Sequence, residues 1–490
     1  MSETTHAELP TDTSPFLLNE DLAPAKDRNW KTYSLFAMWM SDVHSIGGYT
    51  FAAGLFAFGL VGWQVLVALI IGIALVNVAI NWMGYAGQRT GVPYPVLARA
   101  SFGVFGANIP ALVRAIIAVF WYGIQTWLAS VALIVLLLRV WPQLAPMTHG
   151  GFLGLSPLGW IAFLALAALQ LGLFSGGMNA VRKLVDFAGP AIWVVMLGLA
   201  VWVLVKSGGN IAFDFAGKQA DFGGMVYGFF ASISLTVAYF STLMLNYCDF
   251  SRFAPNKRAV RLANFWGLSV NFIAFSIVSV VVTGGSLAIF GKYIFDPVEL
   301  VAKIDSTVAI LIGAITFVVA TIGINVVANF VSPAYDFANA APKHVSFRRG
   351  GIITAILSVL ILPWNVYANP VAVNYFLGGL AAFLGPLYAI IMSDYYLLQH
   401  GKVNVPDLYR SVPGSQYLYR KGINPTAVYA FIPSAAVAAV VALVPQLGML
   451  APFSWFIGAA IAMGLYLLLS RGRQTAADMS MSNVPAAPAA

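Results

Sequence analysis

The stretch "WMSDVHSIGGYTF", residues 39–51, places an aspartate and a histidine two residues apart inside an otherwise apolar run. Gly47 and Gly48 then interrupt the run. Each glycine disfavours a helix by about 1 kcal/mol relative to alanine, and backbone groups inside a membrane need hydrogen-bond partners. The stretch therefore predicts either a helix that breaks in mid-membrane and lines a cavity, or a glycine kink that allows close helix packing.

The composition places the chain in a membrane. Hydrophobic residues make up 60% of the 490 residues and charged residues 9%, with a mean hydropathy of +0.82, whereas about 25% of the residues of an ordinary soluble domain are charged. Residues 1–29 are polar without a long apolar core, which predicts a cytosolic tail rather than a cleavable signal peptide. Cys248 is the only cysteine, so no disulfide holds the fold.

Apolar windows long enough to cross about 30 Å of hydrocarbon predict twelve membrane spans. An even number of spans places both termini on one side of the membrane. The windows are 33–59, 62–87, 110–138, 157–175, 187–206, 222–247, 262–290, 306–335, 347–364, 370–398, 426–446 and 451–470.

The basic residues alternate with these spans. Most of the 26 Lys and Arg residues, including Arg99 and Arg114, fall on the side of the termini, and the positive-inside rule makes that side cytoplasmic. The basic residues on the other side are Arg139, Lys206, Lys218, Lys292 and Lys303. The net charge of +8 is thus explained by topology, and no nucleic-acid partner is expected.

Asp42 is the only carboxylate that we predict well inside a span, and His44 is the only such histidine. An ionisable group inside a membrane is a candidate functional residue; the alternative is a structural carboxylate capped by nearby helix N-termini. A single acid and a single histidine inside the membrane argue against an enzyme, which would need clustered carboxylates, metal-binding histidines or an activated nucleophile. The sequence also lacks the nucleotide-binding motif GxxxxGK[ST], which argues against transport driven directly by ATP. A channel or a substrate sensor stays open as an alternative to a transporter.

Polar side chains also recur at helical spacing in other spans. Trp121 and Gln125 are four residues apart and share a helix face. An aromatic plate beside an amide, which both donates and accepts, suits a flat polar heterocycle. Asn325 and Asn329 repeat this spacing in the eighth span and predict a polar cavity or an interhelical hydrogen bond. The sixth span is unusually polar, with Ser232, Ser234, Thr236, Tyr239, Phe240, Ser241 and Thr242.

Over residues 20–472 the chain resembles the nucleobase:cation symporter-1 family, and most closely its bacterial allantoin and uracil permease branch. The matching pieces, in order, are "TGVPYPVLARASFGVFGANIPALVRA", "WYGIQTW", "NYCDFSRFA", "NVVANFVSPAYDFANAAPK" and "LGPLYAIIMSDYYLL". The resemblance implies an all-α integral membrane protein with a LeuT-type architecture, in which two inverted five-helix repeats precede two further helices and helices 1 and 6 are discontinuous. It also favours a monomer without a cofactor.

This architecture divides the chain into six parts. They are a cytoplasmic tail (1–30), the first repeat (31–207), the second repeat (220–398), a cytoplasmic loop (399–425), the last two spans (426–470) and a C-terminal tail (471–490). The resemblance places the protein in the bacterial inner membrane.

The family likeness also assigns substrate contacts. It implies that Trp121 stacks on one face of the substrate ring, Gln125 hydrogen-bonds its edge and Asn329 supplies a second amide. Phe240 stands where the hydantoin-transporting member has a tryptophan, and would close an aromatic sandwich. Because phenylalanine is the smaller plate, uracil is the first expectation, with allantoin, a hydantoin or cytosine as alternatives.

Three further positions follow from the same likeness. Tyr239 stands where the hydantoin-transporting member has a glycine, and Ser45 stands where it has a glutamine. Leu377 is placed near the external gate of the family. All three are expected to lie near the substrate pathway.

The coupling ion is where the chain departs from the family. Sodium-dependent members use two hydroxyl groups of helix 8, and this chain has Gly323 and Ile324 at the matching positions. The positions that match the remaining backbone ligands are Ser41, His44 and Ala320. Three carbonyls alone make a poor site for a hard cation.

We therefore expect proton coupling, with Asp42 as the leading proton site and His44 as the second candidate. Removal of a carboxylate from water disfavours its charged form, and a histidine titrates near neutrality. One alternative is that the Asp42 carboxylate replaces the lost hydroxyls and keeps a sodium site. Another is facilitated diffusion without coupling.

Overall fold

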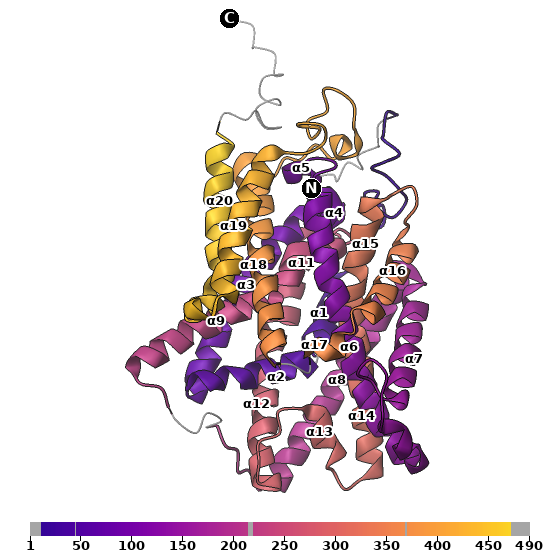
Figure 1. Ribbon diagram of the computed structural model, residues 1–490, viewed down its shortest axis with the longest axis vertical. Helices are drawn as coiled ribbons and strands as arrows, with labels where there is room; N and C mark the ends of the chain where they lie inside the picture. The colour runs from indigo at the N-terminus through magenta and orange to yellow at the C-terminus, as the bar shows by residue number, and fades with distance from the viewer. Residues whose placement is uncertain (1–10, 45, 214–218, 368–369, 472–490) are drawn as a thin grey trace, which may run out of the picture.

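The computed structural model describes residues 11–44, 46–213, 219–367 and 370–471. These residues form a bundle of long helices that run mostly along one common direction (Figure 1). Extended structure among them is limited to the isolated bridges Phe152–Leu155 and Arg420–Ile423.

The helices fall into three groups: α-helices of five or more residues, single turns of four residues, and π-helical segments. The longer helices are α1 (Thr32–Val43), α2 (Ile46–Gly54), α3 (Gly62–Thr90), α6 (Asn108–Val140), α7 (Pro157–Phe174), α8 (Gly177–Lys206), α9 (Phe222–Asn246), α11 (Lys257–Ala263), α12 (Asn271–Phe290), α13 (Pro297–Ala302), α14 (Thr307–Ile324), α15 (Val331–Ala340), α16 (Phe347–Leu360), α17 (Pro363–Tyr367), α18 (Pro370–Met392), α19 (Pro425–Leu443) and α20 (Ser454–Leu469). Single turns are α4 (Tyr94–Leu97), α5 (Arg99–Phe102) and α10 (Cys248–Ser251). The π-helical segments are η3 (Asn264–Val270), η4 (Asn325–Phe330) and η5 (Ser393–Leu398), and short 3-10 turns fill several connections.

Ten helices among the described residues are long and apolar enough to cross a membrane. Two predicted windows have no such helix. Window 33–59 is divided between α1 and α2, and window 347–364 contains α16, which has 14 residues. The chain is therefore an all-helical, multi-pass membrane protein.

The first predicted span is divided beside Asp42. Helix α1 ends at Val43, and His44 leaves the helical conformation with φ −84° and ψ 57°. Helix α2 then begins at Ile46 and carries the Gly47–Gly48 pair in its first turn.

The structure differs from the expectation in the sixth span, because α9 is one continuous helix from Phe222 to Asn246. Residues 231–246 contain neither glycine nor proline, so nothing in this half of the helix breaks it. The hydroxyls of Ser232 and Thr236 donate to carbonyls of the preceding turn, at 2.7 and 2.8 Å, and so add no demand for partners outside the helix.

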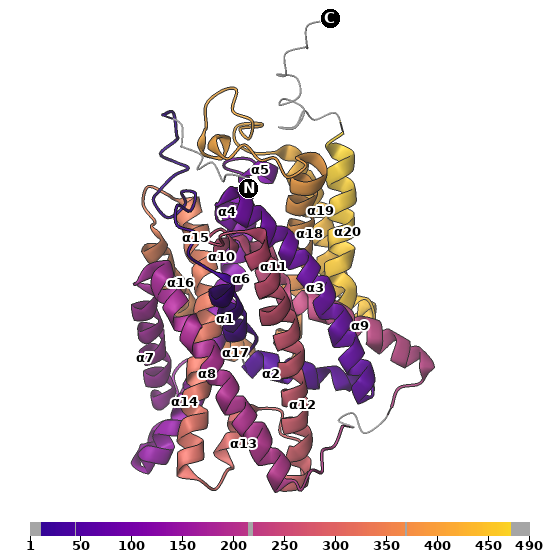
Figure 2. The same cartoon turned by 180° about the vertical axis from the view of Figure 1, so that it is seen from behind.

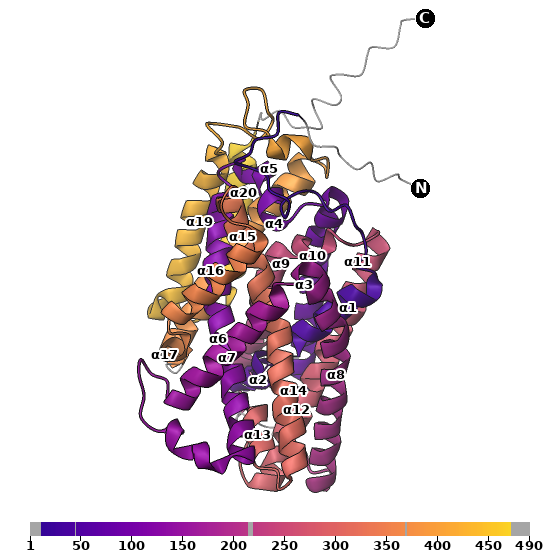
Figure 3. The same cartoon turned by 90° about the vertical axis from the view of Figure 1, so that its right-hand side faces the viewer.

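Helix packing brings α3 against α9, α6 against α14 and α15, and α1 against α8. Gly72 of α3 allows one of these approaches, since a Cβ atom there would lie 2.6 Å from Cβ of Thr236. The C-terminal helices α19 and α20 pack together with α18 at one side of the bundle (Figure 3).

The connections α4, α5 and α10 gather at one end of the bundle, and α13 lies at the other (Figure 2). Arg99 and Arg114, which were expected on the side of the termini, are fully buried. Arg99 donates to the carbonyl of Leu408 at 3.0 Å and to Oδ1 of Asn339 at 2.6 Å, so it ties separate connections together. Carbonyl and amide oxygens of the protein accept the hydrogen bonds that water would accept from an exposed arginine.

The described part of the predicted N-terminal tail, residues 11–30, packs on the same end of the bundle. Leu17, Leu22 and Trp30 are buried. Ser14 donates its backbone N–H to the carbonyl of Tyr409 at 2.8 Å, and the Tyr409 hydroxyl donates to the carbonyl of Leu22 at 2.7 Å. This part of the tail is therefore an ordered component of the fold.

Candidate functional site

A single cavity brings the polar motifs of four separate spans together. The cavity and the open space that adjoins it together hold about 420 Å³ that no atom occupies. Its ten lining residues come from α1, α6, α9 and the α14–η4 segment, and they are Asp42, Trp121, Gln125, Tyr239, Phe240, Thr242, Leu243, Ile324, Ala328 and Asn329. Five of the six predicted substrate contacts are among them; the sixth, Ser45, lies outside the described residues.

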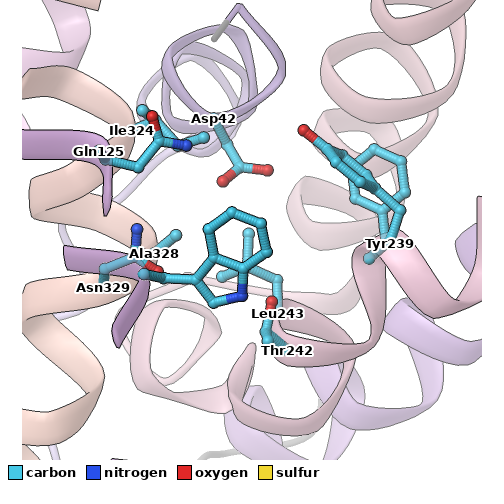
Figure 4. Close-up of a pocket in the computed structure, with 10 residues that line it drawn as sticks. Asp42, Gln125, Tyr239, Thr242, Leu243, Ile324, Ala328 and Asn329 are labelled. Carbon is cyan, nitrogen blue, oxygen red and sulfur yellow. The ribbon is translucent and has the colours of Figure 1, made fainter. Parts of the chain in front are cut away.

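The lining residues divide into distinct sides (Figure 4). Gln125 lies on the same side as the α14–η4 residues, and Tyr239 lies on the opposite side. The carboxylate of Asp42 points from α1 into the space between them. A bound molecule would thus meet amides on one side and an acid from the interrupted span.

Asp42 reaches the cavity because it lies in the last turn of α1, just before the break in the first span. Its side chain is only 6% exposed. Among the residues that the structure describes, none forms a hydrogen bond or an ion pair with its carboxylate. A carboxylate that faces a cavity inside a membrane is characteristic of ion and substrate pathways.

Aromatic rings form part of the cavity wall. The Phe240 ring meets the Tyr239 ring edge-on, with centroids 5.1 Å apart and planes at 83°. Tyr239 in turn stacks on Phe51 of α2, with centroids 4.7 Å apart. The segment after the break in the first span thereby supports the aromatic side of the cavity. Trp121, from α6, is the third aromatic side chain of the wall.

His44 does not line the cavity, although it is only two residues from Asp42. Its Nε2 lies 3.0 Å from Oδ1 of Asn271, which also accepts the indole N–H of Trp193 at 2.6 Å. The imidazole packs between Trp193 and Phe275, at centroid distances of 5.1 and 4.8 Å. The structure thus separates the two ionisable groups onto different sides of the first span.

The positions that match a sodium site lie between α1 and α14. Ser41 and Ala320 are buried, and Oγ of Ser41 has no hydrogen-bond partner among the described residues. A Cβ atom at Gly323 would lie 3.7 Å from this hydroxyl oxygen. Ile324 adds an apolar side chain to the cavity wall. The side chain of Leu377, in α18, lies outside those described.

Sequence reasoning missed several residues of the site. Leu243 and Ala328 line the cavity but carry no chemical signal, although each lies within one helical turn of a predicted contact. Gln170 of α7 is buried and bonds Asn325, and a lone amide in an apolar run was a visible signal. Arg114 donates to the carbonyl of Ala328 at 2.8 Å, directly behind the wall.

Comparison with known proteins identifies the family. A family described as "Permease for cytosine/purines, uracil, thiamine, allantoin" matches residues 23–458. The chain is 37% identical to the allantoin permease of Bacillus subtilis (strain 168), over 93% of each chain. It is 30% identical to a putative allantoin permease of Escherichia coli (strain K12), over 92% of this chain and 94% of the relative. It is 33% identical to the purine-uracil permease NCS1 of Arabidopsis thaliana, over 85% of this chain and 70% of the relative.

Solved structures agree on the fold. The nucleobase-cation-symport-1 family transporter Mhp1, in a closed conformation with bromovinylhydantoin bound, has a TM-score of 0.73 at 23% identity over 93% of this chain and 95% of that chain. A Na⁺-coupled sialic acid symporter has a TM-score of 0.60 at 12% identity over 94% and 92%. These likenesses support the LeuT-type fold, and together with the family match they make the chain a transporter rather than an enzyme. The chain belongs to the nucleobase:cation symporter-1 family, the permeases for cytosine/purines, uracil, thiamine and allantoin.

Proposed function

We propose that the chain imports a small planar nucleobase-type heterocycle by proton symport, with alternating access. The observation that carries this proposal is the convergence on one cavity of Trp121, Phe240, Gln125, Asn329 and Asp42. Two aromatic side chains suit the faces of a flat ring, and two amides suit an edge with alternating N–H and C=O groups. An acid in the same cavity lets proton binding and substrate binding influence each other.

Allantoin is the first substrate that we propose, and uracil is the second. Two of the three relatives described above have names that refer to allantoin, and this outweighs the sequence-based preference for uracil. Uracil keeps support from the Arabidopsis relative and from the smaller aromatic plate that Phe240 provides. Hydantoins and cytosine present a similar edge and follow in that order.

Proton coupling is favoured by what surrounds Asp42. Its carboxylate faces the cavity, whereas His44 is engaged with Asn271 on another side of the span. Gly323 and Ile324 offer no hydroxyl to a sodium ion. The competing account, in which Asp42 and carbonyls such as those of Ser41 and Ala320 hold sodium, predicts uptake that depends on sodium.

The proposed topology has twelve spans with both termini in the cytoplasm of a bacterium and the protein in its inner membrane. Residues 31–207 and 220–398 form the two inverted repeats, and the break after α1 lies in the first one. The last two spans, 426–470, follow the cytoplasmic loop 399–425. Each monomer contains a complete pathway.

The testing experiment is initial uptake of labelled allantoin and of labelled uracil in cells without their own permeases. Each is measured with and without sodium, before and after a protonophore. We expect uptake of one of them that ignores sodium and collapses with the proton gradient. Sodium-stimulated uptake would contradict proton coupling, and downhill flux or binding without accumulation would instead indicate a channel or a sensor.

A further inference from the structure

A chain of buried polar side chains runs from α7 across α6 to the cavity. Oε1 of Gln170 accepts from Nδ2 of Asn325 at 2.7 Å. The same nitrogen lies 2.9 Å from Oγ1 of Thr126. Oδ1 of Asn325 accepts from Nδ2 of Asn329 at 3.1 Å, and Asn329 lines the cavity. All four side chains are buried, so water competes little for these hydrogen bonds.

Two backbone carbonyls fix the donor and acceptor directions in this row of hydrogen-bonded side chains. The carbonyl of Tyr122 lies 3.1 Å from Nδ2 of Asn325, and the carbonyl of Leu166 lies 3.2 Å from Nε2 of Gln170. A carbonyl oxygen only accepts, so the nitrogen end of each amide is identified by its partner. Asn325 must then turn its oxygen to Asn329, which must donate through its nitrogen.

The consequence for the cavity is a fixed acceptor. One N–H of Asn329 is donated to Asn325, which fixes the orientation of the amide, and its carbonyl oxygen Oδ1 is the acceptor that it offers to a ligand. Gln125, on the same side of the cavity (Figure 4), differs, because no described residue bonds its amide and its Oε1 is buried without a partner. The Gln125 amide can therefore adopt either orientation toward a ligand. The Asn329 amide cannot flip without losing its hydrogen bond to Asn325.

We propose that Asn325 is a specificity-determining positioning residue, which holds the Asn329 carbonyl oxygen toward the substrate so that the transported heterocycle must present a ring N–H there. The inference rests on the proposed function, since it concerns the edge of a heterocycle in this cavity. A ring oxygen at that point would place two acceptors against each other. Uracil-like and hydantoin-like rings meet the requirement, because their ring N–H groups alternate with carbonyls.

The test uses purified full-length protein and competition binding against labelled allantoin or uracil, whichever the wild type binds. The competitors are uracil, its two analogues in which O replaces N1–H or N3–H, hydantoin and oxazolidine-2,4-dione. The replacement of N–H by O leaves the ring size nearly unchanged. We expect at least one oxygen analogue to bind the wild type about 10- to 100-fold more weakly than its parent, the range for a buried hydrogen-bonding group left unpaired.

The decisive variant is Asn325→Leu, which frees Asn329 to turn its nitrogen toward a ring oxygen. We expect the discrimination ratio to fall about tenfold or more. Asn325→Asp keeps an oxygen for Asn329 and should keep the ratio even where both affinities weaken. Asn264→Leu is the matched control, because Asn264 is a buried amide at the start of η3 that bonds Trp39 and Asn81 away from the cavity. It should keep the ratio as well.

The outcomes separate the two proposals. If the wild type binds parents and oxygen analogues equally, or if a folded Asn325→Leu keeps the wild-type ratio, the role of Asn325 is refuted while the proposed function stands. If the wild type binds none of these heterocycles, the proposed function fails and the inference fails with it. Asn325→Ala replaces Asn325→Leu if the larger side chain prevents folding, and the same fall in the ratio is required of it.

Discussion

Asp42 and His44 differ more in surroundings than their two-residue spacing suggests. Asp42 lies in the last turn of a regular helix, points into the cavity and forms no hydrogen bond or ion pair with a described residue. His44 lies in the break, contacts Asn271 and packs against Trp193 and Phe275. One group faces the space where a substrate would bind, and the other faces the neighbouring helices α8 and α12.

Two ionisable groups that are close in the sequence can therefore face different parts of a membrane protein. A continuous helix already places residues two apart about 200° apart, and the break after Val43 lets His44 leave the helical path. We propose that Asp42 titrates in the cavity and that His44 makes a structural contact. The variants below test this division.

Asp42→Asn should have the largest effect. The substitution keeps the shape of the side chain but removes the group that would carry the proton. We expect the loss of concentrative uptake, with the internal substrate concentration rising no higher than the external one, and the loss of any pH dependence due to this group. Accumulation and initial rate are measured from pH 5 to pH 8.

Folding of Asp42→Asn is checked by substrate binding, which should survive because Asn still fills the cavity wall. Accumulation of substrate by this variant with the wild-type pH profile would contradict the assignment.

Gln125→Leu should have the next largest effect. It removes a cavity amide while the aromatic wall stays in place. We expect the substrate affinity to fall about 10- to 100-fold, because a buried polar group of the ligand is left unpaired. The proton dependence that remains should be that of the wild type. Competition binding measures the affinity, and an unchanged affinity would remove Gln125 from the site.

His44→Leu should reduce stability rather than transport. The variant loses the contact with Asn271, which keeps Trp193 as a donor. We expect the free energy of unfolding to fall by about 0.5–1.5 kcal/mol, the net contribution of one hydrogen bond, seen as a lower thermal midpoint in detergent. Uptake per folded molecule and its pH profile should stay unchanged, and a shift of the pH profile would make His44 a coupling residue.

Gly323→Ala should have the smallest effect. The added Cβ would lie 3.5 Å from Cβ of Ser41 and 3.9 Å from Cβ of Ala188, which is ordinary contact. Since alanine favours a helix by about 1 kcal/mol over glycine, we expect equal or slightly higher stability and uptake within about twofold of the wild type. A large loss of uptake without sodium, restored by sodium, would indicate a cation site at this position.

Much of the site could be predicted because its chemistry is unusual for a membrane. An acid, an amide beside a tryptophan and paired asparagines stand out in apolar spans, and the cavity brings Asp42, Trp121, Gln125 and Asn329 together. The first span is divided between Val43 and Ile46, just before the glycine pair, which lies inside α2 rather than at the division.

The remainder depended on three-dimensional packing. No local pattern shows that His44 turns away from the cavity, since that follows from the positions of Asn271 and Trp193 on other helices. No local pattern shows either that Arg114 is buried and donates to the carbonyl of Ala328. The family likeness predicted a break in the sixth span, near Tyr239. The structure instead has one continuous helix, α9, and the residues around Tyr239 favour it.

The most direct measurement of proton coupling uses purified protein in sealed liposomes without sodium. An inward substrate gradient is imposed, and internal pH is followed with a trapped dye. For the wild type we expect substrate-driven acidification, which Asp42→Asn should abolish and His44→Leu should keep. Substrate entry without acidification, or acidification that Asp42→Asn retains, would contradict proton symport through Asp42.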